Sequence, residues 1–258
     1  MYDVATRDRA LKLLAQGLPT SEISRRIGVS RFAIREWRLR TEQGRPLYVG
    51  GSRACPRCTE IPTLPEPQAA YAYLLGLYLG DGCISRTHRE GVFILRIICA
   101  DAWPGLKGEC RRALEAIRPD NKVGTVQRQG CSDIRSYSSH WPCLFPQYGA
   151  GKKHNRKIEL ASWQQEIVTK HPEQLVRGLI HSDGCRILNR VRRPLPSGER
   201  WYEYPRYLFV NESTDIRVLF TDALDRLDIE WRRSKPNTVS VAKREAVAQL
   251  DEFVGPKY

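Results

Sequence analysis

A duplicated motif is the feature that most constrains how this chain can fold. Residues 74–83 and 176–185 each hold an apolar helical stretch, a glycine five residues before an aspartate, and Asp-Gly-Cys at the end. The two aspartates, Asp81 and Asp183, lie 102 residues apart. A strand pattern follows each motif, and Asp101 and Asp215 then open amphipathic helices. One such motif could arise by chance, but two with matching sequels predict two copies of one α/β unit.

These residues resemble the LAGLIDADG family of homing endonucleases over roughly residues 71–258. The resemblance implies an α+β fold, in which a pseudo-twofold pair of αββαββα repeats spans residues 71–160 and 161–258. The first hairpin of the second repeat is expected to be about 12 residues longer. Leu79 and His181 stand where the motif name spells its first acid. The resemblance also implies that the motif helices pack through small residues, here Gly76, Gly80, Gly178 and Ser182.

The resemblance further implies that Asp81 and Asp183 are catalytic carboxylates at the bottom of that helix pair. They would bind Mg²⁺ or Mn²⁺ together with the backbone carbonyls of Gly80 and Ser182, one acid serving each DNA strand. Phosphodiester hydrolysis needs an activated water and a stabilised leaving oxygen, and a divalent ion supplies both. The alternative is that each aspartate merely ends its helix, a position that the helix dipole makes unfavourable for an acid.

A basic residue late in each repeat is also implied, because positive charge stabilises the transition state. Lys243 follows a strand at residues 238–241, so it is the candidate in the second repeat, with Arg244 as the alternate. An ordinary solvated residue at a helix start is the other interpretation of Lys243. The equivalent turn of the first repeat, residues 138–140, holds no lysine, so the two half-sites are expected to differ.

The family reads DNA with the surfaces of its sheets, which implies DNA contacts along the strands. We expect strands at residues 92–99, 122–129, 133–138, 187–193, 202–211 and 230–241. Individually the basic residues on them could be solvated charges, but together they suit a protein that covers an extended duplex. The candidates on or beside the strands are Arg128, Arg135, Arg190, Arg192, Arg193, Arg232, Arg233 and Lys235. Lys152 and Lys153, in a basic segment between the repeats, suit phosphate contact.

Residues 1–41 predict a small all-α domain of the helix-turn-helix type. The first helix is expected over residues 5–17. Thr20 or Ser21 is expected to cap the second helix, and Ser30 the third, over residues 31–40. The pattern resembles the helix-turn-helix of resolvases, transposases and repressors, whose third helix lies in the major groove. The residues that would meet DNA are Ser30, Arg31, Arg35 and Arg38. A helical bundle that docks a protein is the alternative.

Residues 42–70 predict a Pro/Gly-rich linker that carries a Cys-Pro-Arg-Cys element. Cys55 and Cys58 have the spacing of zinc ligands, but the chain holds no second pair of this kind. The pair is therefore half of a structural Zn²⁺ site completed from elsewhere in the fold, or simply two cysteines in a turn. The eight cysteines suggest thiols or metal ligands rather than a disulfide framework.

The charge of the chain favours a polyanionic partner. Lys and Arg number 42 against 29 Asp and Glu, a formal net charge of +13, and double-stranded DNA is the partner expected. The chain has no apolar run of membrane-spanning length and no secretory leader at its start. We therefore expect a cytoplasmic, nucleoid-associated monomer with internal pseudo-twofold symmetry, neither secreted nor in a membrane.

Two functions follow from these expectations. The first is a site-specific endonuclease that hydrolyses phosphodiester bonds on both strands with a divalent metal. The alternative is a catalytically silent, DNA-binding transcriptional regulator on the same scaffold. The sporulation-regulator family of actinobacteria also joins this fold to a helix-turn-helix and acts without cleavage, but its members lack the acids. Both acids are present here, which favours the nuclease, whereas the added helical domain favours the regulator.

Overall fold

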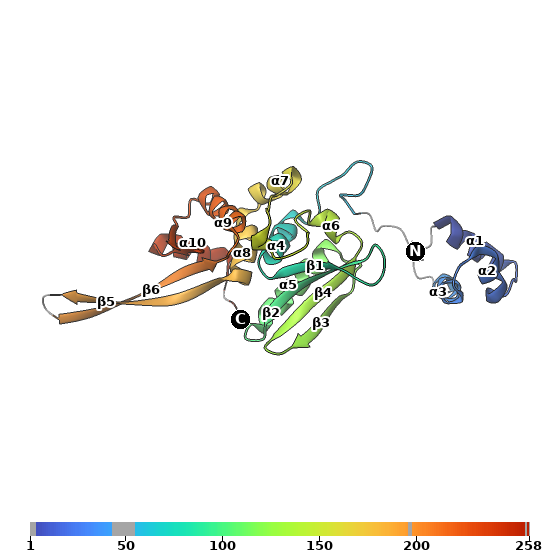
Figure 1. The fold of residues 1–258 in the computed structure, drawn as a ribbon, viewed down its shortest axis with the longest axis horizontal. Helices are drawn as coiled ribbons and strands as arrows, with labels where there is room; N and C mark the ends of the chain where they lie inside the picture. The colour runs from blue at the N-terminus through green and yellow to red at the C-terminus, as the bar shows by residue number, and fades with distance from the viewer. Residues whose placement is uncertain (1–3, 43–54, 196–197, 256, 258) are drawn as a thin grey trace. The chain divides into compact units, whose positions relative to one another are not determined.

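The structure, a computed structural model, describes residues 4–42, 55–195, 198–255 and 257. The chain divides into two compact units whose boundary falls at the Cys55–Pro56 peptide. Each unit is described by itself below, and Figure 1 labels its helices and strands.

The first unit consists of three helices, as predicted: α1 (Val4–Ala15), α2 (Thr20–Ile27) and α3 (Arg31–Glu42). Gly28, with a φ of 68°, takes the left-handed conformation that turns the chain between α2 and α3. Ser30 caps α3, because its hydroxyl accepts a hydrogen bond from the backbone N–H of Ala33 at 3.2 Å. The expected cap of α2 was wrong: Pro19 holds that position and Thr20 is already helical. The buried core is Ala10, Ile23, Val29, Ile34 and Trp37.

The second unit contains two copies of one αββαββα order, which confirms the α+β fold expected from the motif. The first copy is α4 (Gln68–Leu79), β1 (Gly82–Arg86), β2 (Phe93–Ala100), α5 (Pro104–Ile117), β3 (Val123–Arg128), β4 (Cys131–Ser138) and α6 (Trp141–Leu144). The second is α8 (Pro172–Asp183), β5 (Gly184–Leu195), β6 (Gly198–Val210), α9 (Thr214–Arg226), β7 (Arg232–Lys235), β8 (Thr238–Val241) and α10 (Arg244–Phe253). Between the copies lie the 3₁₀ turn η1 (Lys153–Asn155) and α7 (Ser162–Lys170).

The two sheets share one topology. Their strand orders are β1-β2-β4-β3 and β5-β6-β8-β7, with antiparallel neighbours throughout. The expectation of one strand over residues 230–241 was wrong, because this segment is the β7–β8 hairpin with Lys235 paired to Thr238. Pro236 lies in the turn, where its missing N–H breaks no ladder bond.

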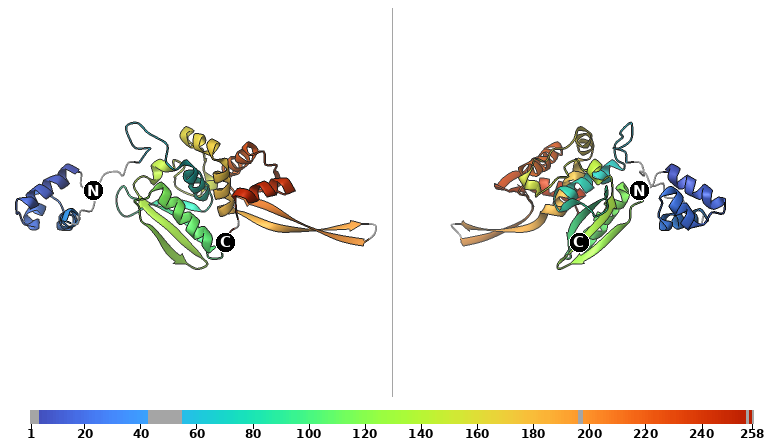
Figure 2. Two further views of the ribbon diagram at one scale, coloured as in Figure 1. Left: turned by 180° about the vertical axis from the view of Figure 1, so that it is seen from behind. Right: turned by 45° about the vertical axis from the view of Figure 1, so that its right-hand side comes forward.

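The first hairpin of the second copy is much longer than its counterpart, as predicted. Strands β5 and β6 have 12 and 13 residues, against 5 and 8 in β1 and β2. This hairpin, which we name the hairpin arm (residues 184–210), extends beyond the rest of the second unit (Figures 1 and 2). Helix α10 packs on β6, and α5 packs on β2 and β4.

Helices α4 and α8 lie side by side and join the two copies (Figure 1). Their backbones meet at the glycine seam, formed by Gly76 and Gly178. A Cβ at Gly76 would lie 2.7 Å from the Leu175 carbonyl oxygen, and one at Gly178 would lie 2.3 Å from the Tyr73 carbonyl oxygen. Only glycine permits backbones this close, so the seam fixes how the two motifs meet. Within the described residues, no helix is long and apolar enough to cross a membrane.

Candidate functional site

The ends of the two motif helices converge at the bottom of the α4–α8 pair. Asp183 is the last residue of α8, and Asp81 follows Gly80, the C-cap residue of α4. A Cβ at Gly80 would lie 2.1 Å from the Ser182 hydroxyl oxygen and 3.0 Å from Asp183 Oδ2. The structure therefore brings together the four residues expected there, Asp81, Asp183, Gly80 and Ser182.

A lysine side chain closes the loop around the first acid. Asp81 lies between Gly80 and Gly82, and Lys153 Nζ donates to the carbonyl oxygens of these two glycines, at 2.6 and 2.8 Å. The same ammonium also donates to the carbonyl of Tyr78 and lies 5.2 Å from the centre of its ring. Lys153, which comes from η1, thus places a positive charge directly beside Asp81.

A second lysine repeats this arrangement at the other acid. Asp183 lies between Ser182 and Gly184, and Lys257 Nζ donates to both of their carbonyl oxygens, at 3.3 Å for Ser182. Lys257 follows α10, the last helix of its copy, as Lys153 follows α6. The two half-sites therefore share one design: an acid, its two flanking carbonyls, and a lysine from beyond the end of the repeat.

The electrostatics of these groups are mutually dependent. Burial and the charge of Asp183 raise the pKa of Asp81 to about 6, although Lys153 and Lys257 oppose the shift. Burial raises the pKa of Asp183 as well, while a hydrogen bond from Asn211 lowers it. Burial lowers the pKa of Lys153 to about 8, against the attraction of both acids, and burial lowers that of Lys257 too. Shifts in opposite directions within one small cluster are typical of functional sites.

The two half-sites differ at the residue that follows the second strand of each copy. In the second copy Asn211 Nδ2 donates to Asp183 Oδ2 at 2.6 Å. In the first copy Asp101 holds this position and instead accepts from Lys107 and Gln127, at 2.6 and 2.7 Å. A surface hollow of about 450 Å³ opens beside the acids and is lined by Asn211, Asp183 and Lys153, among others.

The donors at this site are hard oxygen ligands. Two carboxylates and the backbone carbonyls beside them suit Mg²⁺, Mn²⁺ or Ca²⁺. Among the described residues that line the hollow, Cys83 has the one thiol and the exposed His154 the one imidazole. The carbonyls of Gly80 and Ser182 already accept from lysines, but a carbonyl oxygen has a second lone pair. The residues present therefore fit a divalent cation at the carboxylates.

The structure does not bring Lys243 to the acids. Lys243 is exposed at the start of α10, forms an ion pair with Glu230, and lines a different surface hollow with Asp225. Its alternate, Arg244, begins the same helix. The turn at residues 138–140 holds no lysine, as expected, but Lys153, which lies further along the chain, reaches the carbonyls beside Asp81. Sequence reasoning missed Lys257 altogether, and it had assigned Lys153 to a phosphate contact on the surface.

Most residues expected to contact DNA are exposed. In the first unit these are Ser30, Arg31, Arg35 and Arg38, of which Arg38 pairs with Glu42. In the second unit they are Lys152, Arg128, Arg190, Arg192, Arg232, Arg233 and Lys235, with Arg135 partly buried. Arg128 pairs with Asp133, Arg190 with Glu203 and Arg192 with Glu199. The side chain of Arg193 lies outside the described residues.

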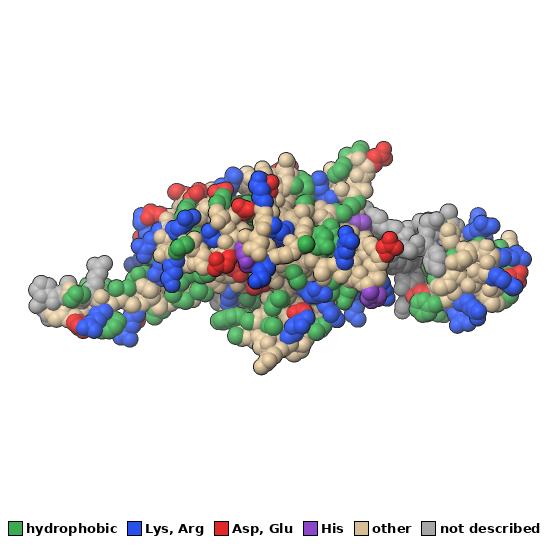
Figure 3. Space-filling view, in the orientation of Figure 1, with side chains coloured by type: hydrophobic (Ala, Val, Ile, Leu, Met, Phe, Trp, Pro, Cys, Tyr) green, Lys and Arg blue, Asp and Glu red, His purple; other side chains and the backbone are tan. Residues whose placement is uncertain are grey.

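The hairpin arm combines basic and aromatic side chains. The guanidinium of Arg190 lies 4.6 Å from the ring centre of Trp201, and that of Arg200 lies 5.3 Å from Tyr202. Trp201 is 51% exposed and Leu188 is 64% exposed, so the arm presents apolar surface as well as charge. Figure 3 shows this mixture of Lys/Arg and hydrophobic side chains along the arm.

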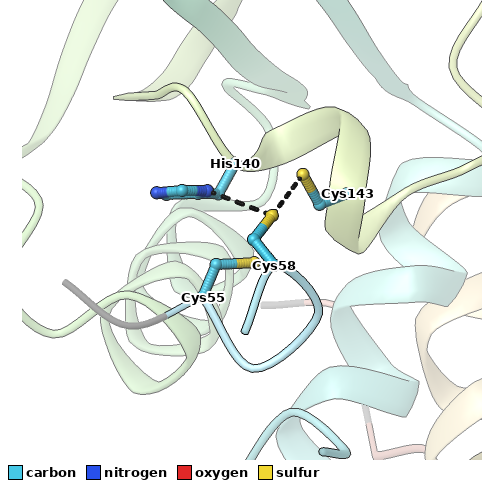
Figure 4. Close-up of side chains that lie close together, drawn as sticks. All are labelled: Cys55, Cys58, His140 and Cys143. Atoms are coloured by element: carbon cyan, nitrogen blue, oxygen red, sulfur yellow. Dashed lines mark hydrogen bonds between the residues drawn. The ribbon is translucent and has the colours of Figure 1, made fainter. Parts of the chain in front are cut away.

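The structure also brings two further side chains that could bind a metal to the Cys-Pro-Arg-Cys element. Cys55 and Cys58 lie beside His140 and Cys143 (Figure 4). His140 is the residue just before α6, and Cys143 lies on α6. The sequence signal for the second pair is His140-Trp141-Pro142-Cys143, which has the same spacing as the first pair.

The second unit is thus an α+β unit that contains two repeats in one chain. Its two carboxylates, Asp81 and Asp183, lie where the two repeats meet. No protein-family model matches the sequence, and no curated protein matches it. Solved structures of LAGLIDADG enzymes are similar to it, in line with the resemblance expected from the motif.

One similar structure is I-DmoI in complex with DNA and Mn, with 13% identity and a TM-score of 0.45; the match covers 74% of this chain and 99% of that one. Another is the LAGLIDADG meganuclease I-AabMI bound to uncleaved DNA, with 12% identity and a TM-score of 0.45, covering 71% of this chain and 82% of that one. A third is a mutant of I-SmaMI, with 10% identity and a TM-score of 0.43, covering 72% of this chain and 85% of that one.

Proposed function

We propose that this chain is a divalent-metal-dependent endonuclease that binds a specific site in double-stranded DNA and cuts both strands. The observation that carries the proposal is the pair of half-buried carboxylates, Asp81 and Asp183, which the glycine seam brings together. Each has a lysine-capped pair of carbonyls around it. A structural role alone does not explain two half-buried acids whose pKa values are both raised.

In this proposal Asp81 and Asp183 hold the metal, one for each DNA strand, with the carbonyls of Gly80 and Ser182 as further ligands. A bound Mg²⁺ would activate water and stabilise charge on the phosphate oxygens. In the first half-site, Lys153 takes the kind of role that was expected of Lys243 in the second: its ammonium holds the loop in place and offers positive charge to the scissile phosphate.

The hairpin arm supplies the larger part of the proposed DNA contact in the second unit. Its 12 paired positions span roughly 40 Å, a little more than one turn of duplex DNA. The major groove admits a two-stranded ribbon of this kind. Arg190 and Arg192 on β5 lie on this ribbon, and Arg232, Arg233 and Lys235 on β7 lie at the edge of the same sheet. Two repeats in one chain suit a monomer on an asymmetric site.

The first unit adds a further proposed contact with DNA. Arg31, Arg35 and Arg38 are exposed on α3, the helix that would lie in the major groove. This arginine-rich face is also the observation that favours the second candidate function, a transcriptional regulator that binds DNA without cutting it. The similar solved structures are described as complexes with DNA and with Mn, Ca or Mg, which supports the nuclease.

Cleavage of a DNA library separates the two functions. The full chain is incubated with Mg²⁺ and a library of randomised duplexes, and the new DNA ends are sequenced. The nuclease predicts reproducible cut sites that disappear in Asp81→Asn and in Asp183→Asn. Asp222→Asn, a change of an exposed acid on α9, is the matched control and should keep the cut sites. Specific binding with no cutting in Mg²⁺ or Mn²⁺ would establish the regulator instead.

A further inference from the structure

A second cluster of metal-ligating side chains shares no residue with the acid site. Cys55, Cys58, His140 and Cys143 each offer one ligand atom, and these four atoms all lie within 4.8 Å of one another. Cys58 Sγ lies 3.6 Å from His140 Nδ1 and 2.9 Å from Cys143 Sγ. Figure 4 shows the four side chains converging from two segments that are far apart in the sequence.

Both segments present their ligands from tight turns. In the Cys-Pro-Arg-Cys loop, the Pro56 carbonyl accepts from the Thr63 backbone N–H at 2.7 Å, which closes the loop behind the cysteines. At α6, the backbone N–H of Cys143 donates to the His140 carbonyl at 3.1 Å. A spacing of three residues in such a turn puts both side chains on one side, so each segment offers two ligands.

The base of the cluster is rigid. Trp141, between His140 and Cys143, is fully buried, and its indole N–H donates to the Ser136 carbonyl at 2.9 Å. The backbone N–H of His140 donates to the Ser138 hydroxyl at 3.1 Å. These bonds anchor the His140–Cys143 turn to β4, so the ligands on this side do not depend on a bound ion for their position.

We infer that Cys55, Cys58, His140 and Cys143 form a structural zinc site. Three sulfurs and one imidazole nitrogen are a ligand set that zinc takes in tetrahedral structural sites. In such a site, zinc–sulfur bonds of about 2.3 Å put the sulfurs roughly 3.8 Å apart. Cys58 Sγ and His140 Nδ1, at 3.6 Å, already have a spacing that suits zinc, whereas Cys58 Sγ and Cys143 Sγ, at 2.9 Å, would move apart by roughly 0.9 Å as the ion binds. Four protein ligands leave no open position, so the site is structural and not catalytic.

The ligand chemistry separates this site from the acids. Thiolates select zinc and not Mg²⁺ or Mn²⁺, which prefer oxygen donors. Each of the three cysteines gives up its thiol proton to the solvent as it binds, and His140 binds as the neutral imidazole. The two metals are therefore held by different residues and have different roles.

The position of the site indicates what the zinc does. It ties the loop that precedes α4, the first motif helix, to the last helix of the same repeat, across 85 residues between Cys58 and Cys143. Closing so long a loop removes conformational freedom from the unfolded chain. Zinc thus fixes the start of α4 against the first repeat.

Metal analysis of the purified full chain tests the site directly. The chain is produced with zinc in the medium, dialysed against metal-free buffer with a reducing agent, and its metals are measured by mass spectrometry. We expect about one zinc per chain. Cobalt in place of zinc should give the visible bands of tetrahedral Co²⁺ and thiolate-to-cobalt charge transfer.

The zinc content of variants shows whether these four residues bind zinc or only contribute to the stability of the fold. Cys58→Ser and His140→Ala should lose more than about nine-tenths of the zinc. His140→Cys should keep it, because four cysteines also bind zinc in this geometry. Cys131→Ser, which removes a thiol on β4 outside the cluster, is the matched control and should keep the full content.

Three results would overturn the inference. The first is wild-type protein with no zinc after production and refolding in zinc. The second is zinc retained in Cys58→Ser combined with Cys143→Ser. The third is a disulfide between Cys58 and Cys143 in the reduced, zinc-supplied protein, found by peptide mass spectrometry. Metal content does not depend on DNA cleavage, so these results are independent of the proposed nuclease activity.

Discussion

The glycine seam gives the sharpest test of how the acid site is built. Gly178 lies on α8, and a Cβ added there would stand 2.3 Å from the Tyr73 carbonyl oxygen and 3.0 Å from the Cα of Gly76. Non-bonded carbon atoms in good contact lie about 3.5–4.0 Å apart, so α4 would have to retreat by roughly 1 Å. Both neighbours are backbone atoms and cannot rotate away, so Gly178→Ala forces the two motif helices apart.

We expect Gly178→Ala to lower the free energy of unfolding by about 3 kcal/mol, the upper part of the range for overpacked cores. This corresponds to a melting temperature about 6–12 °C lower for a unit of this size. The free energy is measured by urea denaturation of the full chain, followed by tryptophan fluorescence.

Gly108→Ala is the matched control for the seam. Gly108 is also a helical glycine, on α5, but the nearest atom to its added Cβ is the end of the Arg112 side chain, at 3.4 Å. That side chain can move, so the control should be neutral or should gain up to about 1 kcal/mol from the better helix propensity of alanine. If Gly178→Ala is as stable as Gly108→Ala, the seam does not set the spacing of the helices.

Three further predictions concern charge. Because the pKa of Asp81 is raised to about 6 and the proposed metal binding needs its ionised form, the single-turnover rate at a sub-saturating Mg²⁺ concentration should be about tenfold below its plateau at pH 5. Lys153→Met removes a charge that lowers the pKa of Asp81, so the midpoint of the pH–rate profile should move up, whereas Lys243→Met should leave it in place. Arg190→Ala should weaken DNA binding and reduce the slope of log K against log salt concentration by about one, measured by fluorescence anisotropy.

The architecture of the second unit was predictable because the sequence repeats the same motif, at residues 74–83 and 176–185. Two motifs at a fixed separation gave the repeat, the helix pair and the longer hairpin, and the alternating apolar residues gave most of the strands. The β7–β8 hairpin was missed because only β8, Thr-Val-Ser-Val, has strand-forming residues, whereas β7, Arg-Arg-Ser-Lys, has none that mark a separate strand. Local propensity gives no register, so one strand and a short hairpin are not distinguished until the sheet is assembled.

The lysines at the acids were missed for a different reason. Lys153 and Lys257 lie 72 and 74 residues after their acids, so no local pattern connects them to Asp81 and Asp183. Repeat symmetry is the signal that could have found them: the lysines are 104 residues apart and the acids 102. The second half of the proposed zinc site did not stand out because a Cys-x-x-Cys pair has no second copy in the chain, whereas His140 and Cys143 form a His-x-x-Cys pair of the same spacing.

The close approach of α4 to α8 and the electrostatics of the acid site are consequences of one constraint. Since the glycine seam lets the backbones meet, the charge of Asp183 helps to raise the pKa of Asp81, and Lys153 and Lys257 offset this shift only in part. A carboxyl whose pKa rises on folding reduces stability as it ionises, so Asp81 makes the folded state less favourable as pH rises from about 4 to about 6. An acid pair held at that cost, with oxygen donors around it, favours additional positive charge, which a divalent cation bound in the proposed way would supply.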